Sequence, residues 1–144
     1  MTKQLKNEQK EQNIREIEKS VSRFSEHLMS DSKWVRLISG LIKNADKIKK
    51  IEFRKVQNKQ RGELYINSDT KFNFDYWQNG FEGNNSLGGW ITFKEIEYLV
   101  FPKIVNKEAQ LEQDLDTIKQ IIENVGLFSL DIDDNRIKLI CYRE

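Results

Sequence analysis

The stretch that decides the fold runs from residue 51 to residue 76 and reads IEFRKVQNKQRGELYINSDTKFNFDY. Apolar and polar residues alternate in three short runs of this stretch, and turn-rich breaks at residues 58–62 and 67–70 separate the runs. A period of two is typical of strands with one buried face, and short breaks favour antiparallel neighbours. The stretch therefore predicts an antiparallel meander. Its inward positions are Ile51 and Phe53, Leu64 and Ile66, then Phe72, Phe74 and Tyr76.

The segment after this stretch changes character twice. Residues 79–89 are the most glycine-rich part of the chain and predict a loop. Residues 90–101 are apolar and rich in β-branched and aromatic side chains, which predicts one bent strand or two short ones. A helix is the alternative, because Thr92 and Glu95 have the spacing of a capping box. As a strand, this segment brings the meander to about four strands.

Two helices precede the predicted sheet. Apolar residues recur at spacings of three and four over residues 14–28, which predicts a first amphipathic helix that contains His27. A second such stripe covers residues 34–45, and Ser30, Asp31 and Ser32 supply the N-cap candidates before it. We therefore expect two helices that precede the strands in the sequence.

A helix and a hairpin follow the predicted sheet. The stripe over residues 111–125 predicts a third helix, with Asn106 as its N-cap and Gly126 at its C-terminal end. Alternation over residues 128–132 and 137–141 predicts a closing hairpin. The order α-α-β-β-β-β-α-β-β, with antiparallel strands and helices grouped at the ends, predicts an α+β fold.

Length and composition predict one domain. The chain has 144 residues, and we expect residues 14–144 to form the domain and residues 1–13 to form a polar, frayed extension. No apolar run approaches the roughly 20 residues that span a bilayer, and the N-terminus has no apolar signal region. The single cysteine, Cys141, excludes an internal disulfide framework. We therefore expect a cytoplasmic protein without a membrane partner.

Charge is divided along the chain. Residues 1–61 carry 16 Lys/Arg and 8 Asp/Glu, whereas residues 62–144 carry 8 Lys/Arg and 15 Asp/Glu. The densest basic segment, residues 43–61, has 8 basic and 2 acidic side chains. Such a division can mark a charged partner, although two solvated halves give the same pattern.

The usual catalytic and metal-binding patterns do not occur. The only histidine and the only cysteine, His27 and Cys141, cannot form a zinc site without several carboxylates, and we expect Cys141 to be a buried, inert thiol. The glycine-rich loop has neither GxGxxG nor Gly-Lys-Ser/Thr. We therefore predict no cofactor, no metal and no catalytic residue. An enzyme with an unrecognised carboxylate site near Asp75, Glu82 and Tyr98 remains an alternative.

Aromatic and acidic residues around the glycine-rich loop are the candidate partner-binding site. If the strand at residues 72–76 continues regularly, Trp77 falls on its polar face with Asp75, and Phe81 and Glu82 lie in the loop. Exposed aromatic residues beside carboxylates are typical of protein-binding hot spots. The other interpretation is that the loop folds back and buries Trp77 and Phe81.

The basic segment gives a second hypothesis. Residues 43–61 could form a nucleic-acid-binding surface, although no known nucleic-acid-binding motif accompanies them. Its binding residues would be Lys49, Lys50, Arg54 and Lys55.

Residues 33–142 resemble a family of small bacterial proteins associated with toxin-immunity loci. The resemblance rests on Lys33-Trp34, Phe74-Asp75-Tyr76-Trp77 with Phe81-Glu82-Gly83, Ile96-Glu97-Tyr98-Leu99-Val100, and Asp133-Asp134-Asn135-Arg136-Ile137 running to Tyr142. The chain departs from the family at Cys141, where the family has glycine. The resemblance implies a binding protein that neutralises a cognate toxin, and it implies no catalytic residues. Neither the partner's identity nor the oligomeric state follows from it.

Overall fold

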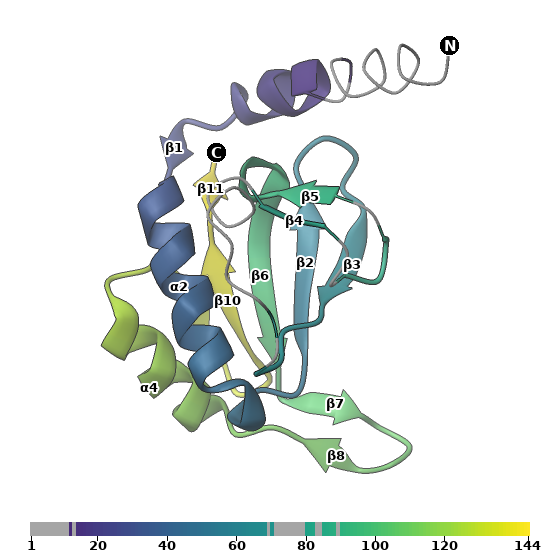
Figure 1. Ribbon diagram of the computed structural model, residues 1–144, viewed down its shortest axis with the longest axis vertical. Helices are drawn as coiled ribbons and strands as arrows, with labels where there is room; N and C mark the ends of the chain where they lie inside the picture. Colours follow the sequence, from purple (N-terminus) through teal and green to yellow (C-terminus); the bar gives the residue numbers. More distant parts are fainter. Residues whose placement is uncertain (1–11, 13, 69, 71–79, 83–84, 89) are drawn as a thin grey trace.

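The computed structural model describes residues 12, 14–68, 70, 80–82, 85–88 and 90–144. The fold belongs to the α+β class, as predicted, and its centre is a five-stranded antiparallel sheet in the order β3-β2-β6-β10-β9 (Figure 1). Helices cover one side of this sheet (Figure 1). The five strands are β2 (Ile51–Lys55), β3 (Arg61–Leu64), β6 (Ile96–Pro102), β9 (Leu130–Ile132) and β10 (Arg136–Ile140).

The sheet confirms two predicted hairpins and corrects the meander. The β2–β3 and β9–β10 hairpins pair as expected. However, β2 lies between β3 and β6, so sequence order and sheet order differ. The third predicted strand, residues 72–76, lies outside the described residues. One face of the sheet is apolar and packs in the core. Phe53 pairs with Leu99, Leu99 pairs with Leu139, and all three side chains are buried.

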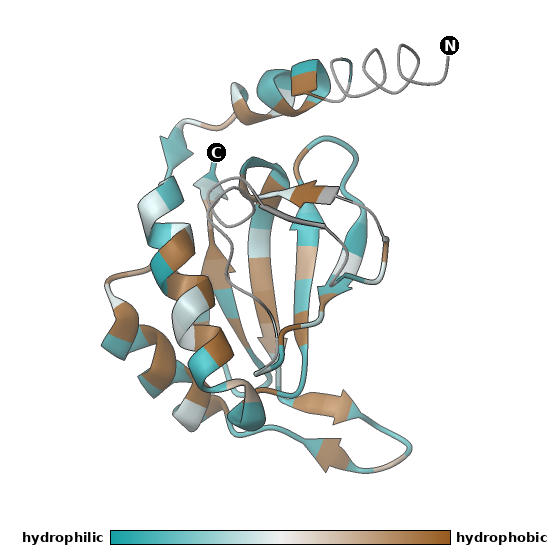
Figure 2. Ribbon diagram, in the orientation of Figure 1, coloured by the Kyte–Doolittle hydropathy of each residue, from teal (hydrophilic) through white to brown (hydrophobic). Residues whose placement is uncertain are grey.

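Two antiparallel helices, α2 (Asp31–Lys43) and α4 (Leu115–Val125), pack against each other and against this face (Figure 1). The Ser30 hydroxyl caps α2 by accepting a hydrogen bond from the Lys33 amide at 3.2 Å. Gly40 lies where the helices cross, and a Cβ atom there would come within 2.5 Å of Val125 Cγ2. The glycine therefore permits close contact between the helices. Apolar ribbon segments of both helices and the strands are brown in Figure 2.

The first predicted helix is shorter than the apolar stripe. Residues 14–21 are helical, but His27 lies in β1 (Glu26–His27), which pairs with β11 (Tyr142–Arg143). The ring of Tyr142 contacts the rings of Phe24 and His27 at centroid distances of 5.3 and 5.2 Å. Strand pairing and ring contacts at the C-terminus thus take these residues out of the helix, and the prediction of a helix up to residue 28 is wrong.

The last helix also begins later than the stripe predicted. Asp114 is its N-cap, and its carboxylate accepts hydrogen bonds from the amides of Asp116 and Thr117 at 3.0 and 3.2 Å. Leu111 instead lies in β8 (Leu111–Glu112), which pairs with β7 (Ile104–Asn106). Asn106 therefore does not cap the helix. The apolar stripe predicted an earlier start because Leu111, which lies in a strand, has the spacing of the helical period.

A small ribbon of two strands corrects the predicted loop. Residues 80–82 form β4 (Gly80–Glu82), which pairs with β5 (Trp90–Thr92). A 3₁₀ helix, Phe93–Glu95, joins β5 to β6 and carries the capping box between Thr92 and Glu95. The strand interpretation and the helix interpretation of residues 90–101 are therefore each partly right. The segment contains two strands, and one turn of 3₁₀ helix with a capping box joins them. Trp34 stacks on Phe93 at a centroid distance of 5.0 Å and is buried.

Candidate protein-binding surface

The structure tests only part of the predicted partner-binding site. Asp75 and Trp77 lie outside the described residues. Phe81 and Glu82 lie in β4, where their backbones pair with those of Ile91 and Trp90. The prediction that Phe81 lies in an irregular loop is therefore wrong.

The four basic residues proposed for nucleic-acid binding each have a contact within the domain. Arg54 and Lys55 are consecutive at the end of β2, where the pairing of β2 with β6 becomes irregular. Carboxylates compensate the charges of Lys50, Arg54 and Lys55 locally, whereas Lys49 donates to a backbone carbonyl. The pairs are Lys49 Nζ with the Glu112 carbonyl at 3.2 Å, Lys50 with Glu63 at 3.6 Å, Arg54 with Glu97 at 3.9 Å and Lys55 with Glu95 at 3.1 Å.

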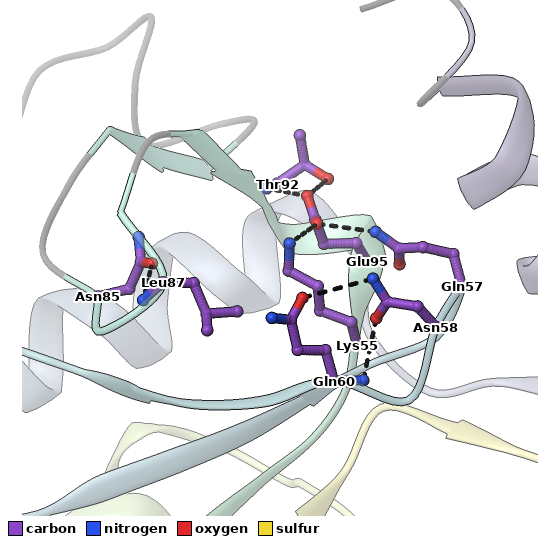
Figure 3. Close-up of polar contacts among 8 residues, drawn as sticks. All are labelled: Lys55, Gln57, Asn58, Gln60, Asn85, Leu87, Thr92 and Glu95. Carbon is purple, nitrogen blue, oxygen red and sulfur yellow. Dashed lines mark hydrogen bonds and ion pairs between the residues drawn. The ribbon is translucent and has the colours of Figure 1, made fainter. Parts of the chain in front are cut away.

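Glu95 is the most buried carboxylate among the described residues, with 4% exposure. Its carboxylate accepts hydrogen bonds from the Thr92 amide at 2.7 Å, the Thr92 hydroxyl at 2.9 Å and Gln57 Nε2 at 3.1 Å, and it pairs with Lys55 (Figure 3). Four donors on one buried carboxylate compensate its desolvation. The cluster therefore ties the capped turn to the end of β2, which is a structural role.

Tyr98, the third residue of the carboxylate alternative, lies on the opposite face of the sheet from the helices. Its ring is contacted by the Lys138 ammonium group at 4.1 Å and by the Arg54 guanidinium group at 5.9 Å from the centroid. Tyr98 thus neighbours two cations, and Asp75 of the same alternative lies outside the described residues. No group of three or more potential metal ligands occurs within the part of the chain that the structure describes.

The β7–β8 hairpin projects from the domain as an arm, which we define as residues 103–112 (Figure 1). Its strands pair only with each other, through Ile104 with Glu112 and Asn106 with Leu111. Ile104 is 50% exposed and Leu111 is 40% exposed. Both strands of the arm are brown in Figure 2, so apolar side chains lie on a part of the molecule that reaches into solvent.

A single buried side chain anchors the arm to the domain. Gln113 is 5% exposed, and its Oε1 accepts hydrogen bonds from the amides of Lys49 and Lys50 at 2.9 and 3.2 Å. Its Nε2 donates to the carbonyls of Lys50 and Pro102. The backbone adds a bond from the Gln113 amide to the Lys103 carbonyl at 2.9 Å. An isolated two-stranded hairpin is marginally stable, so these bonds help to fix its direction, together with the bonds from Lys49 Nζ to the Glu112 carbonyl and from the Lys103 amide to the Asn135 carbonyl.

The tip of the arm turns without a glycine. Asn106 Oδ1 accepts a hydrogen bond from the Ala109 amide at 3.1 Å, so Asn106 caps this turn in place of the helix. Gln110 has a φ of 52°, in the left-handed region that non-glycine residues seldom occupy. Sequence reasoning missed the arm because its turn has no Gly or Pro and its apolar residue Leu111 matched the helical stripe.

A partly open cavity of about 510 Å³ lies between helical residues 14–21 and the domain, and His27, Asp31 and Tyr142 line it together with Trp34. The Tyr142 hydroxyl donates to the Lys94 carbonyl at 2.8 Å, and burial raises the pKa of Tyr142 above its ordinary value. Burial likewise raises the pKa of the adjacent Cys141 thiol, which is therefore a poor nucleophile. The groups around this cavity hold the N-terminal segment in place.

Comparison with known proteins gives no relative. No family model, no curated protein and no solved structure matches this chain. Among the described residues, no helix is long and apolar enough to cross a membrane.

Proposed function

We propose that this chain is a non-enzymatic protein-binding protein, and specifically an immunity-type antagonist of a bacterial toxin. The observation that carries the protein-binding part is the anchored arm with its exposed Ile104 and Leu111. The antagonist part rests on the resemblance to proteins of toxin-immunity loci. No cofactor is assigned to this function.

The arm has the physical properties of a binding element. Isolated exposed apolar residues are common on protein surfaces, but here the pairing of Ile104 with Glu112 and of Leu111 with Asn106 places one exposed apolar residue on each face of a projecting hairpin, where a partner that encloses the hairpin can bury both. Because Gln113 already fixes the hairpin, less conformational entropy is lost when a partner binds. A projecting hairpin also has a shape that can enter a concave surface, such as the active site of an enzyme that an antagonist blocks.

The buried polar groups support a binding function over catalysis. Glu95 is held by four donors, Cys141 is buried with a raised pKa, and the Tyr142 hydroxyl is bonded to a backbone carbonyl. These groups are engaged in contacts that stabilise the fold. A general acid or nucleophile needs access to its substrate and a suitable pKa.

The test is affinity capture from the source organism's lysate, with and without nuclease, read by mass spectrometry. The baits are the wild-type chain, the arm variant Ile104→Ser with Leu111→Ser, and the control Leu127→Ser. Leu127 is 91% exposed and lies outside the arm, so its change removes apolar surface without altering the proposed contact. We expect one stoichiometric protein that survives nuclease, that the control retains and that the arm variant loses.

The captured protein then tests the antagonist part. Expression of that protein alone should arrest growth of a host, and co-expression of this chain should restore it. Capture that collapses with nuclease would favour nucleic acid and contradict the proposal. Equal capture by the wild type and the arm variant would contradict the assignment of the arm.

A further inference from the structure

A groove between α2 and α4 indicates the chemistry of the protein partner. It has a volume of about 600 Å³, and residues from the end of α2 and the start of α4, among them Lys43 and Thr117, line it. The end of α2 and the start of α4 lie on the side of the molecule from which the arm projects (Figure 1). We define the helix groove by six of its lining residues, Arg36, Lys43, Lys47, Gln120, Ile121 and Val125.

The groove is positively charged on one side. Arg36, Lys43 and Lys47 are exposed and form no ion pair with any described residue. No Asp or Glu occurs among the described residues that line the groove. Arg36 and Lys43 are seven residues apart on α2, so they lie on one side of the helix about 10 Å from each other. The groove is thus an uncompensated row of cations, unlike the paired cations of β2.

Three apolar side chains lie among the polar residues that line the groove. Val35 of α2 and Ile121 and Val125 of α4 contribute to its lining. Gly40 lets the two helices approach closely there, which keeps these side chains together. An apolar strip beside a row of cations complements a helix with one apolar face and acidic residues next to it. Such a helix in a groove between two helices is a common mode of peptide recognition.

We infer that the helix groove binds an acidic amphipathic helix of the protein partner, and this inference rests on the proposed protein-binding function. The groove ends close to the arm, because Lys47 lines the groove and Lys49, two residues later, donates from Nζ to the Glu112 carbonyl at the base of the arm. One partner can therefore contact both. Three cations without a lining aromatic residue favour an acidic peptide over nucleic acid, which needs more cations or stacking platforms.

The test measures fluorescence anisotropy with three labelled probes at low and physiological salt. The first is a synthetic amphipathic helix of about 18 residues with leucines on one stripe and glutamates elsewhere, a length sufficient for several turns. The second replaces its glutamates with lysines, and the third is a single-stranded DNA of similar length. The proteins are the full wild-type chain, Arg36→Glu with Lys43→Glu, and a control with the same charge change, Arg23→Glu with Arg61→Glu, at exposed positions outside the groove.

We expect the acidic helix to bind the wild type about tenfold more tightly than the lysine helix, with an affinity that falls as salt rises. The groove variant should lose about tenfold and the control less than about twofold. Amide NMR shifts caused by the acidic helix should centre on Gly40, Thr117 and Val125. Equal binding of both helices, shifts elsewhere, or groove-dependent binding of the DNA in place of the acidic helix would each overturn the inference.

The two proposals can fail separately. If capture yields a partner that the arm variant loses but no probe prefers the groove, only the groove assignment fails. If the acidic helix binds the groove and capture yields no protein, the groove assignment stands and the proposed function fails.

Discussion

At the scale of single residues, Gln113 is the side chain on which the arm depends. Replacing it with alanine leaves the amides of Lys49 and Lys50 and the carbonyl of Pro102 without their partner. We expect Gln113→Ala to lower the free energy of unfolding by about 3 kcal/mol, since buried groups that lose a hydrogen bond keep their desolvation cost. Urea denaturation measures this, with the exposed Gln120→Ala as the control. Equal stability of the two variants would show that the arm is held by other contacts.

Asp114 makes the start of α4 sensitive to acid. Hydrogen bonds from the Thr117 amide and hydroxyl and from the Asp116 amide lower the pKa of Asp114 below its ordinary value of 3.8. Because the folded-state pKa is lowered, this contribution to stability is complete well above pH 3.8 and is lost as the pH falls through the lower, folded-state pKa. Asparagine caps helices equally well but does not titrate.

We therefore expect Asp114→Asn to match the wild type near neutral pH and to lose less stability during acid titration below pH 3.8. Helical circular dichroism during urea denaturation at several pH values measures the difference. Parallel curves for the two proteins over the whole range would contradict a role for the Asp114 carboxylate.

At the scale of elements, the crossing of α2 and α4 determines the effect of Gly40→Ala. Helix propensity alone predicts that alanine stabilises the helix by about 1 kcal/mol. The new Cβ atom would lie 2.5 Å from Val125 Cγ2, so we expect a net loss of about 1–2 kcal/mol instead. In a Val125→Ala background the same change should be neutral or stabilising. Thermal unfolding of the four proteins measures this cycle, and stabilisation by Gly40→Ala in the wild-type background would disprove the close contact.

Apolar periodicity predicted that the helices exist but did not predict all of their boundaries. The stripes over residues 34–45 and 115–125 produced helices because their apolar sides pack against the sheet. Phe24 and Leu28 continued the first stripe, but Phe24 contacts the Tyr142 ring and the Leu28 amide donates to the Cys141 carbonyl at 2.8 Å. A periodic pattern cannot reveal that a distant strand offers a better contact.

At the scale of the whole molecule, Tyr142 joins the segment around residues 24–27 to the C-terminal strand. Its ring contacts Phe24 and His27, and its hydroxyl bonds to Lys94. We expect Tyr142→Ala to release the N-terminal segment, so that amide hydrogen exchange of residues 14–28 accelerates while β6 stays protected. Tyr142→Phe, which keeps the ring, should have a smaller effect. Unchanged exchange in residues 14–28 would show that other contacts, such as those of Ile17, hold the segment.

The sequence determined the fold class, the hairpins β2–β3 and β9–β10, the buried Trp34 and the buried thiol of Cys141, because these depend on local periodicity and apolar burial. Only the tertiary structure decided the rest. It placed β2 beside β6, ended the first helix at residue 21 and turned residues 103–112 into an arm to which Gln113 bonds. These outcomes depend on contacts between residues far apart in the chain, whose energies exceed local preferences and leave no periodic signal in the sequence.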